Sequence, residues 1–297
     1  MQFRFLLPFV ASTLIVATNL SPAAEATGEK STRAVSLTYI ANEGLLITGA
    51  NEKVLIDSIF TNGFGIWDAP SPELLEKIKT ALPPFDHVTC VLATHADADH
   101  FSATDTLQHL LSNPASAFFA PLEVTQQLHQ LPQFDQVKAR VHPAAQSGAP
   151  TEQRIVAGLV VRAVPLEHLT RPPTMPPAPY NVGHLFTIDG IKFFHTGDMG
   201  SQNLQAFQHA KLREEQVDVA IVNCYFFDNA SVESALAVLA CLNPKVVLLA
   251  HLPRQGFEQE TDRILKLPGM PRMIALNSPM QAYAISKKGS ELLISKN

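Results

Sequence analysis

The sequence predicts an α/β protein in which two β-sheets pack face to face and helices cover their outer faces. Each half of the chain begins with short strand patterns and continues with alternating strand and helix patterns, an order typical of layered α/β folds. The chain has 297 residues, of which 46% are hydrophobic, so it can bury a large core. It contains no internal repeat and no low-complexity tract.

The first half opens with a β-meander and continues with strands and helices. The runs SLTYIA, GLLITG and KVLIDSI, within residues 36–59, are separated by turn sequences. HVTCVLA (87–93) predicts a buried strand, and Ser102 and Asp105 then form a capping sequence at the start of a helix. The remaining elements are predicted in this order: a helix at 71–82, a strand at 116–120, a helix at 121–131 and a strand around 137–142.

The second half repeats this order. RIVAGLVVRAVPLEH (154–168) has strand patterning, and the Pro-rich loop 169–179 has the composition of a surface flap. Asp189-Gly190 between alternating apolar runs predicts a hairpin whose second strand ends at Asp198. The elements that follow are a helix at 202–212, strands at 217–223 and 245–251, helices at 231–242 and 257–267, and closing strands at 272–277 and 281–286.

The N-terminus has the pattern of a signal peptide. Arg4 provides a positive charge, an apolar segment follows, and Ala24-Glu25-Ala26 offers a cleavage site. We therefore expect a signal peptide at 1–26, a linker at 27–35 and a single domain at 36–297, with export to the periplasm or the exterior. An uncleaved N-terminal anchor is the alternative, although no stretch is apolar for long enough to predict a stable membrane span.

Charge and cysteine content exclude several protein classes. The formal net charge is −5 and no basic stripe is present, so we expect no nucleic-acid partner. Cys90, Cys224 and Cys241 do not form a disulfide framework, and their apolar surroundings favour core thiols.

The segment THADADHF (94–101) carries the strongest functional signal. It places His95, Asp97, Asp99 and His100 on a short loop between a strand and a helix. Carboxylates and imidazoles at this density favour a bound cation. The alternative is an ordinary polar loop at an acidic helix start.

Three further strand ends carry residues of the same kind: His168, Asp198 and His251. Loops that follow strands commonly converge at one edge of a sheet scaffold. The complete set of donors is sufficient for two ions that share a carboxylate. Asp57 lies at the end of an earlier strand. Its carboxylate would either brace the loop 94–101 or cap the loop that follows Asp57 itself.

These motifs resemble the metallo-β-lactamase-fold superfamily of metallohydrolases over residues 36–294. THADADHF corresponds to the family's H-x-H-x-D-H loop and HTGD to its strand-end G-D, while His168 and His251 stand at the later histidine motifs. NVGHLFTIDGIKFFHTGDMG together with LLAH most resembles the branch of the ascorbate-phosphate lactonase-like enzymes. The resemblance implies a four-layer αββα sandwich of two mixed sheets.

The resemblance also implies a role for each ligand. His95, Asp97 and His168 would hold the first ion, Asp99, His100 and His251 the second, and Asp198 would bridge them. Zn²⁺ or Mn²⁺ is expected, with iron as an alternative. Asp99 is the predicted catalytic residue, because it can also orient the attacking metal-bound hydroxide.

Position 97 departs from the family pattern, which has histidine there. Aspartate favours harder cations than histidine does. Three hypotheses follow for Asp97. It ligates the first ion directly, it binds that ion through a water molecule or only tunes the site, or the first site holds no ion.

The expected function is metal-dependent hydrolysis of a small ester, lactone, amide or phosphoester. Iron-dependent redox chemistry and a non-catalytic binding protein are the alternatives. The partner is a small-molecule substrate, and the sequence does not specify an oligomeric state. The candidate substrate-binding residues are Trp67, Arg171, His184 and Arg254.

Overall fold

The computed structural model describes residues 33–144, 152–227 and 232–297. The expected signal peptide at 1–26, and all but the last three residues of the linker at 27–35, lie outside these ranges. The first strand begins at Val35, one residue before the expected domain start. Among the described residues, no helix combines the length and apolar character needed to cross a bilayer.

The first sheet has eight strands within the described residues, in the order β15-β14-β1-β2-β3-β4-β5-β6. The strands from β15 to β3 pair antiparallel and those from β3 to β6 pair parallel, so the sheet is mixed. Its strands are β1 (Val35–Ala41), β2 (Gly44–Thr48), β3 (Lys53–Ile56), β4 (Cys90–Leu92), β5 (Ala117–Pro121), β6 (Val141–Ala144), β14 (Ala282–Lys288) and β15 (Glu291–Lys296).

The second sheet has seven strands within the described residues, in the order β13-β12-β11-β10-β9-β8-β7. It is also mixed, because β7 to β10 pair antiparallel and β10 to β13 pair parallel. Its strands are β7 (Glu152–Val156), β8 (Leu159–Leu166), β9 (Asn181–Ile188), β10 (Ile191–His195), β11 (Val219–Asn223), β12 (Val246–Ala250) and β13 (Met273–Ala275). The β9–β10 hairpin turns at Asp189-Gly190, as the sequence predicts.

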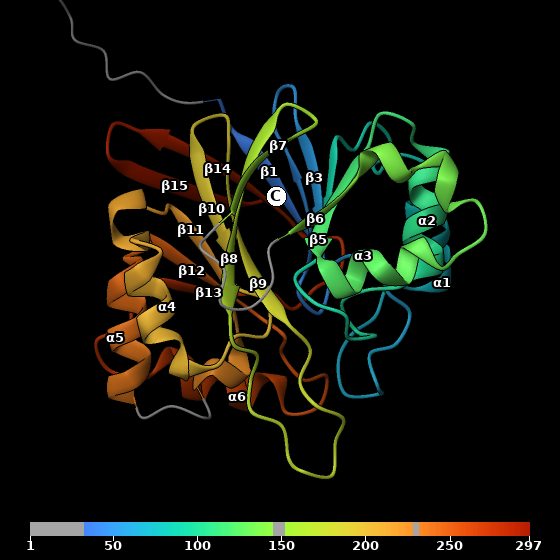
Figure 1. Cartoon of the computed structure of the whole chain (residues 1–297). Helices are drawn as coiled ribbons and strands as arrows, with labels where there is room; N and C mark the ends of the chain where they lie inside the picture. Colours follow the sequence, from blue (N-terminus) through green and yellow to red (C-terminus); the bar gives the residue numbers. More distant parts are fainter. Residues whose placement is uncertain (1–32, 145–151, 228–231) are drawn as a thin grey trace, which may run out of the picture.

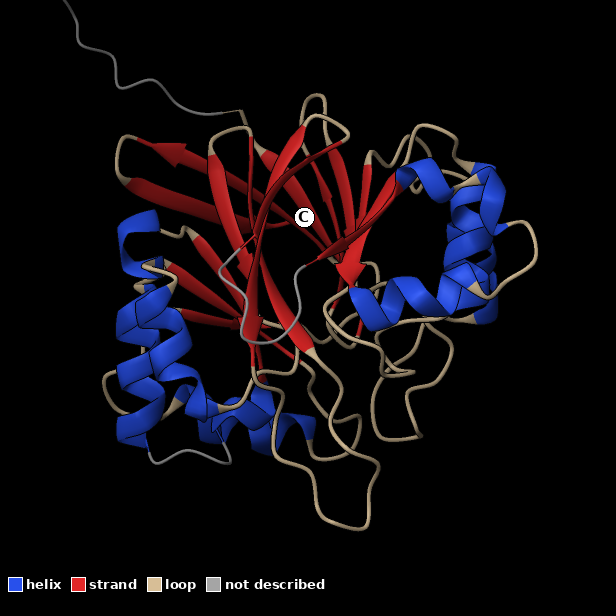
Figure 2. Ribbon diagram, in the orientation of Figure 1, coloured by secondary structure: helices blue, strands red, loops and turns tan. Residues whose placement is uncertain are grey.

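Helices cover the outer face of each sheet, which completes the predicted αββα arrangement (Figures 1 and 2). Phe119, Phe186 and Phe193 belong to the core between the sheets. Phe118 belongs to the core beneath the first group of helices, and Phe207 to the core beneath the second. The first group is α1 (Pro72–Lys79), α2 (Ala103–Ser112) and α3 (Leu122–His129); the second is α4 (Leu204–His209), α5 (Val232–Leu242) and α6 (Phe257–Leu265).

The structure differs from the predicted elements at four places. The strand predicted around 137–142 begins only at Val141, because a 3-10 turn at Lys138–Arg140 takes the place of its first part; another 3-10 turn, at Phe134–Gln136, precedes it. In the Lys138–Arg140 turn the Arg140 side chain points inward and donates to the Leu110 carbonyl at 2.8 Å. The predicted helix at 202–212 is divided into 3-10 turns (Ser201–Asn203 and Leu212–Glu215) on either side of α4, and Lys211 has a left-handed backbone.

The second strand of the hairpin ends at His195, before Asp198, because the backbone turns left-handed at Gly197. The sequence also gives no clear signal for β15, whose residues alternate only weakly between apolar and polar. A 3-10 turn at Cys224–Phe227 follows β11.

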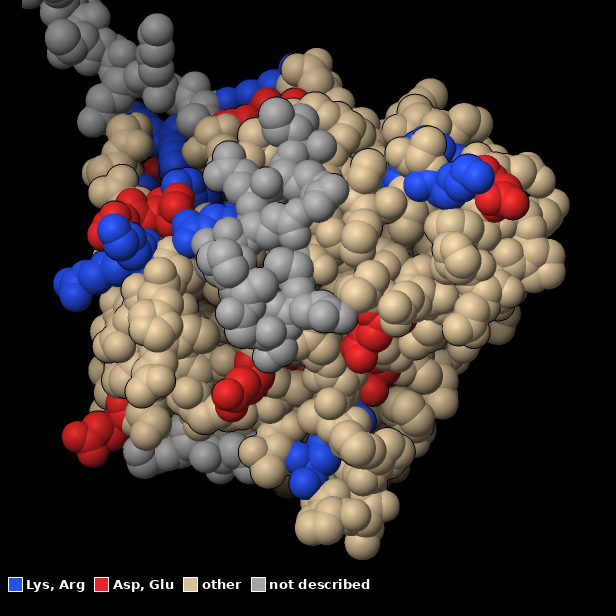
Figure 3. Space-filling view, in the orientation of Figure 1, with Lys and Arg blue, Asp and Glu red and all other residues tan. Residues whose placement is uncertain are grey.

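Charged side chains form small mixed groups on the face shown in Figure 3. Three ion pairs join different elements in the second half of the chain. Lys192 Nζ lies 2.9 Å from Glu215 Oε2, and Arg162 Nη1 lies 2.7 Å from Glu215 Oε1. Lys287 Nζ lies 2.5 Å from Asp218 Oδ2, which ties the two sheets together at their edge.

Candidate metal centre

The loop 94–101 follows the fully buried strand β4, as the sequence predicts. The backbone N–H groups of His100 and Phe101 donate to the Asp97 carbonyl at 3.0 and 2.9 Å, which closes a tight turn. Ser102 then caps α2, because its Oγ accepts from the Asp105 amide. The turn and the cap hold the loop's side chains in place from both ends.

The first set of side chains comprises His95, Asp97, His168 and Asp198, whose ligand atoms all lie within 4.8 Å of one another. Asp97 Oδ2 lies 3.4 Å from His95 Nε2 and 3.3 Å from His168 Nε2. Asp198 Oδ2 lies 3.5 Å from His168 Nε2. These atoms converge from the loop after β4 and from two loops of the second sheet.

The second set comprises Asp99, His100 and His251, also within 4.8 Å. His251 Nε2 lies 3.4 Å from Asp99 Oδ2, and His100 Nε2 lies 3.8 Å from the same oxygen. Asp198 Oδ1 approaches this set, at 3.5 Å from His100 Nε2 and 3.3 Å from His251 Nε2. Asp198 therefore directs one oxygen toward each set.

Gly197 allows Asp198 to occupy this position. Its φ is +55°, and a Cβ there would lie 2.3 Å from Asn181 Oδ1 and 2.7 Å from Thr94 Cβ. A larger residue would push the Asp198 loop away from the loop after β4. The glycine is thus required both by its backbone conformation and by the close approach of the two loops.

Asp57 braces the metal loop, which decides between the two roles expected for it. Its carboxylate accepts from the Thr94 amide at 2.8 Å and from Thr94 Oγ1 at 2.6 Å, and it contacts His100 Nδ1 at 3.1 Å. Burial alone would raise the pKa of Asp57, but the His100 hydrogen bond and nearby histidines outweigh it and lower that pKa. An ionised carboxylate therefore orients His100 from behind.

Two buried residues at the β1–β2 turn, Asn42 and Glu43, also belong to the site, although no local pattern in the sequence marks them. Asn42 Nδ2 donates to the Asp99 carbonyl at 3.0 Å and to Asp99 Oδ2 at 3.3 Å, and the Asn42 carbonyl accepts from the His251 amide at 3.2 Å. Glu43 groups with His100 and Asp198. Burial and the charge of Asp198 raise the pKa of Glu43 well above its ordinary value, which favours its protonated form.

The site's own charges favour a cation. Burial alone would lower the pKa of His251, but the nearby carboxylates Asp198 and Asp99 raise it to about 10. Burial lowers the pKa of His95 well below its ordinary value, so this imidazole stays neutral and able to donate a lone pair. The carboxylates thus attract positive charge while His95 remains free to ligate.

The buried atoms also fit a metal. Among the described residues, His95 Nε2, Asp198 Oδ1 and His251 Nε2 have no well-aligned hydrogen-bond partner. Buried polar atoms without a partner are costly unless another group binds them. Histidine nitrogens and carboxylate oxygens that converge in this way are the donors with which proteins bind divalent metal ions.

Two of the four candidate substrate-binding residues contact the ligand sets. The Trp67 ring lies 4.6 Å from the His251 ring, and its Nε1 donates to the Tyr225 hydroxyl at 3.1 Å. Arg171 Nη2 bonds to Asp97 Oδ2 and lies 3.4 Å from His168 Nε2. Each of the two loops carrying these residues therefore reaches one ligand set.

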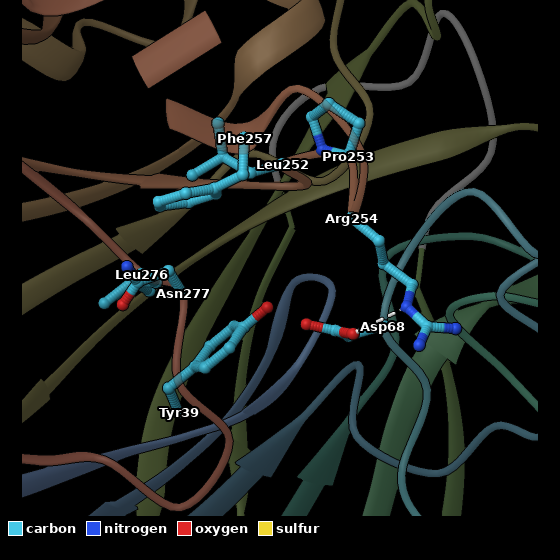
Figure 4. Close-up of a pocket in the computed structure, with 8 residues that line it drawn as sticks. All are labelled: Tyr39, Asp68, Leu252, Pro253, Arg254, Phe257, Leu276 and Asn277. Atoms are coloured by element: carbon cyan, nitrogen blue, oxygen red, sulfur yellow. Dashed lines mark ion pairs between the residues drawn. The ribbon is translucent and has the colours of Figure 1, made fainter. Parts of the chain in front are cut away.

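The other two candidates lie elsewhere. His184 is fully buried and its Nε2 contacts the Ala93 carbonyl at 2.9 Å, so substrate contact by this residue stays a prediction. Arg254 Nε lies 3.3 Å from Asp68 Oδ1. Both residues line a pocket of about 280 Å³, whose lining also includes Leu252, the residue that follows His251 (Figure 4). Figure 4 shows the Tyr39 hydroxyl directed toward Asp68 across this pocket.

A comparison with models of protein families shows to which family the chain belongs. Residues 52–252 match the model of the beta-lactamase superfamily domain, and this range contains all seven ligand-type residues. The chain belongs to the beta-lactamase superfamily. Membership together with the His/Asp sets identifies a metal-dependent hydrolase of the metallo-β-lactamase fold.

Solved structures share the fold of this beta-lactamase superfamily chain at low identity. The metallo hydrolase Igni18 from Ignicoccus hospitalis is 19% identical, with a TM-score of 0.58 over 85% of this chain and 98% of the other. The metallo-beta-lactamase fold protein YhfI from Bacillus subtilis is 14% identical, with a TM-score of 0.58 over 84% and 99%. CmlA, a diiron beta-hydroxylase from Streptomyces venezuelae, is 10% identical, with a TM-score of 0.53 over 85% and 54%. Comparison with curated proteins finds no match.

Proposed function

We propose that the chain hydrolyses a small ester, lactone, amide or phosphoester with two divalent ions, Zn²⁺ or Mn²⁺, one in each ligand set. The observation that carries this proposal is the position of Asp198, which directs Oδ2 toward His168 Nε2 at 3.5 Å and Oδ1 toward His251 Nε2 at 3.3 Å. A carboxylate with one oxygen facing each of two histidine sets suits a pair of ions that share a ligand.

The chain's own residues prepare the site for this chemistry. When bound, the ions would activate water near neutral pH and polarise the oxygen of the scissile bond. Asp57 holds His100 by its Nδ1, so that Nε2 faces Asp198. Asp99 Oδ2 is fixed by Asn42 and lies beside His251, where it can orient an attacking water.

The surroundings of the site favour a small substrate with an apolar part. The loop 60–70 carries Phe64 and Ile66, whose side chains are 53% and 48% exposed, and the flap 169–179 carries Met175 at 51%. Both loops extend at the lower edge of the molecule in Figure 1. Exposed apolar side chains beside a site provide surface for the apolar part of a ligand.

A metal and activity assay tests the function. We expect about two ions per chain by elemental analysis, and turnover of at least one model substrate from an ester, lactone, amide and phosphodiester panel. A chelator should abolish that turnover, and added Mn²⁺ or Zn²⁺ should restore it. Iron in a coloured protein would favour redox chemistry of the kind named for CmlA. If the purified protein contained no metal and added Zn²⁺ and Mn²⁺ did not change its melting temperature, the result would favour a non-catalytic binding protein.

We also propose that residues 1–26 direct export. Arg4 followed by an apolar segment and Ala24-Glu25-Ala26 supports this proposal. The intact mass of protein expressed in a Gram-negative host is the test. A mature start after residue 26 in the periplasmic fraction is expected, and a full-length protein in the cytoplasm would contradict export.

A further inference from the structure

Arg171 is the one cationic side chain of the flap 169–179, and it points into the first ligand set. Its side chain is 15% exposed and that of Asp97 is 22% exposed, so the ion pair is largely shielded from water. Charge-assisted bonds between guanidinium and carboxylate are among the stronger polar contacts in proteins. Any other cation that binds the Asp97 carboxylate must therefore compete with the Arg171 guanidinium.

The guanidinium and a metal ion need the same atoms. Arg171 Nη2 bonds to Asp97 Oδ2 and lies 3.4 Å from His168 Nε2. An ion held by Asp97 and His168 would lie about 2.0–2.2 Å from each ligand atom. The guanidinium nitrogen occupies the neighbourhood of that position, and two cations cannot share it at low cost.

The flap is attached to the body mainly at its two ends. The Leu169 amide donates to the Asp198 carbonyl at 2.8 Å, and the Tyr180 amide donates to Glu123 Oε1 at 2.9 Å. Residues 172–178 between these anchors are exposed. Within the described residues, Arg171 links the flap to the first ligand set, because its Nη2 bonds to Asp97 Oδ2 while its Nη1 donates to the Pro177 carbonyl in the flap interior at 3.5 Å.

We propose that Arg171 is a built-in competitor of the first metal ion: ion binding at Asp97 displaces the guanidinium, releases the flap and frees Arg171 to contact an anionic group of the substrate. This inference rests on the proposed two-ion site. It also gives the aspartate at position 97 a role that histidine could not fill, because a neutral imidazole would not hold the arginine as an ion pair.

The first test is calorimetric titration of metal-free protein with Mn²⁺ and Zn²⁺. The first-set event is identified as the one lost in His168→Ala. We expect Arg171→Gln to tighten the first ion by about tenfold and to leave the second unchanged. Arg162→Gln is the matched control, because it removes another largely shielded arginine–carboxylate pair, with Glu215, and should leave both affinities unchanged.

The second test is hydrogen exchange of the peptide 169–180. In the native protein, adding metal should increase exchange there, whereas Arg171→Gln should show the raised exchange before metal is added. A tighter first ion in Arg171→Gln without any change in flap exchange would mean that Arg171 acts only through its charge, and would overturn the inference.

Equal or weaker first-ion affinity in Arg171→Gln, in a native protein that binds two ions, would also overturn the inference while leaving the proposed function intact. If neither the native protein nor Arg171→Gln bound any ion, both proposals would fail.

Discussion

At the scale of single residues, we expect substitution of Asp198 to have larger effects than substitution of any other residue of the two sets, because its two oxygens face different sets. Asp198→Asn keeps the size of the side chain and removes its charge. We expect bound metal to fall below one ion per chain and turnover to fall by about a thousandfold, since several kcal/mol of charge stabilisation is lost. Elemental analysis and an activity assay measure the two effects.

Asp135→Asn is the control, because this carboxylate is 87% exposed and pairs with Lys138 at the surface. It should retain both metal and activity. Full activity in Asp198→Asn would place the chemistry elsewhere.

His184 links stability to pH. Burial lowers its pKa to about 4, and its Nε2 faces the Ala93 carbonyl. Between about pH 6.5 and pH 4 the unfolded chain binds a proton that the folded chain does not, so stability falls as the pH falls through this window. This residue alone would contribute about 3 kcal/mol to that loss, and the contribution is constant below pH 4 and above pH 6.5.

His184→Gln keeps a donor for the Ala93 carbonyl and removes the titration. Its free energy of unfolding, measured by urea denaturation from pH 4 to pH 7, should therefore fall less steeply than that of the native protein. Parallel curves for the two proteins would contradict this assignment.

At the scale of elements, the ends of strands and turns concentrate unusual backbone geometry. Asn42, Asp57 and His251 have φ values of 53°, 45° and 59° and are not glycines. Such conformations are costly and persist where surrounding contacts impose them. Hydrogen bonds hold all three residues: the Asn42 carbonyl accepts from the His251 amide, and Asp57 accepts from the Thr94 amide.

The elements show what the sequence could predict. Local signals were sufficient for the hairpin at Asp189-Gly190 and for the Ser102 cap, because each depends on neighbouring residues. The contact of Asn42 with Asp99 spans 57 positions, and no local pattern marks it. The ligand loop was predictable by its residue types, whereas its supports at Asn42 and Glu43 depend on how the strands pair.

The loop 60–70 provides a reporter of the second ligand set. Trp67 is the only tryptophan in the chain, and its ring lies 4.6 Å from that of His251. We expect paramagnetic Mn²⁺ to quench its fluorescence, with saturation at the metal concentration that fills the second set.

His251→Ala should remove the quenching, because the second ion is then lost. His87→Ala, whose side chain is 90% exposed, should retain it. If Mn²⁺ still quenched the fluorescence of His251→Ala, Trp67 would not report on an ion in the second set.

At the scale of the whole molecule, the ligand sets connect the two sheets. His95, Asp97, Asp99 and His100 follow β4 of the first sheet, whereas the remaining ligands follow strands of the second. They are His168, Asp198 and His251. An ion bound to either set would therefore link the two halves of the sandwich, and its binding free energy would add to the stability of the whole fold.

Removal of metal should accordingly lower the melting temperature. Two ions, each present at 100 times its dissociation constant, stabilise the folded state by about 5 kcal/mol, and each kcal/mol shifts the melting temperature by about 2–4 °C in a domain of this size. Differential scanning calorimetry with and without chelator should thus show a fall of about 10–20 °C in the native protein and in Asp135→Asn. Asp198→Asn should melt at the same lower temperature in both conditions, because its ligand sets no longer share a carboxylate. If the chelator did not change the melting temperature of the native protein, bound ions would add nothing to the contact between the two sheets, which the apolar core around Phe119, Phe186 and Phe193 and the protein's own polar contacts would then hold together.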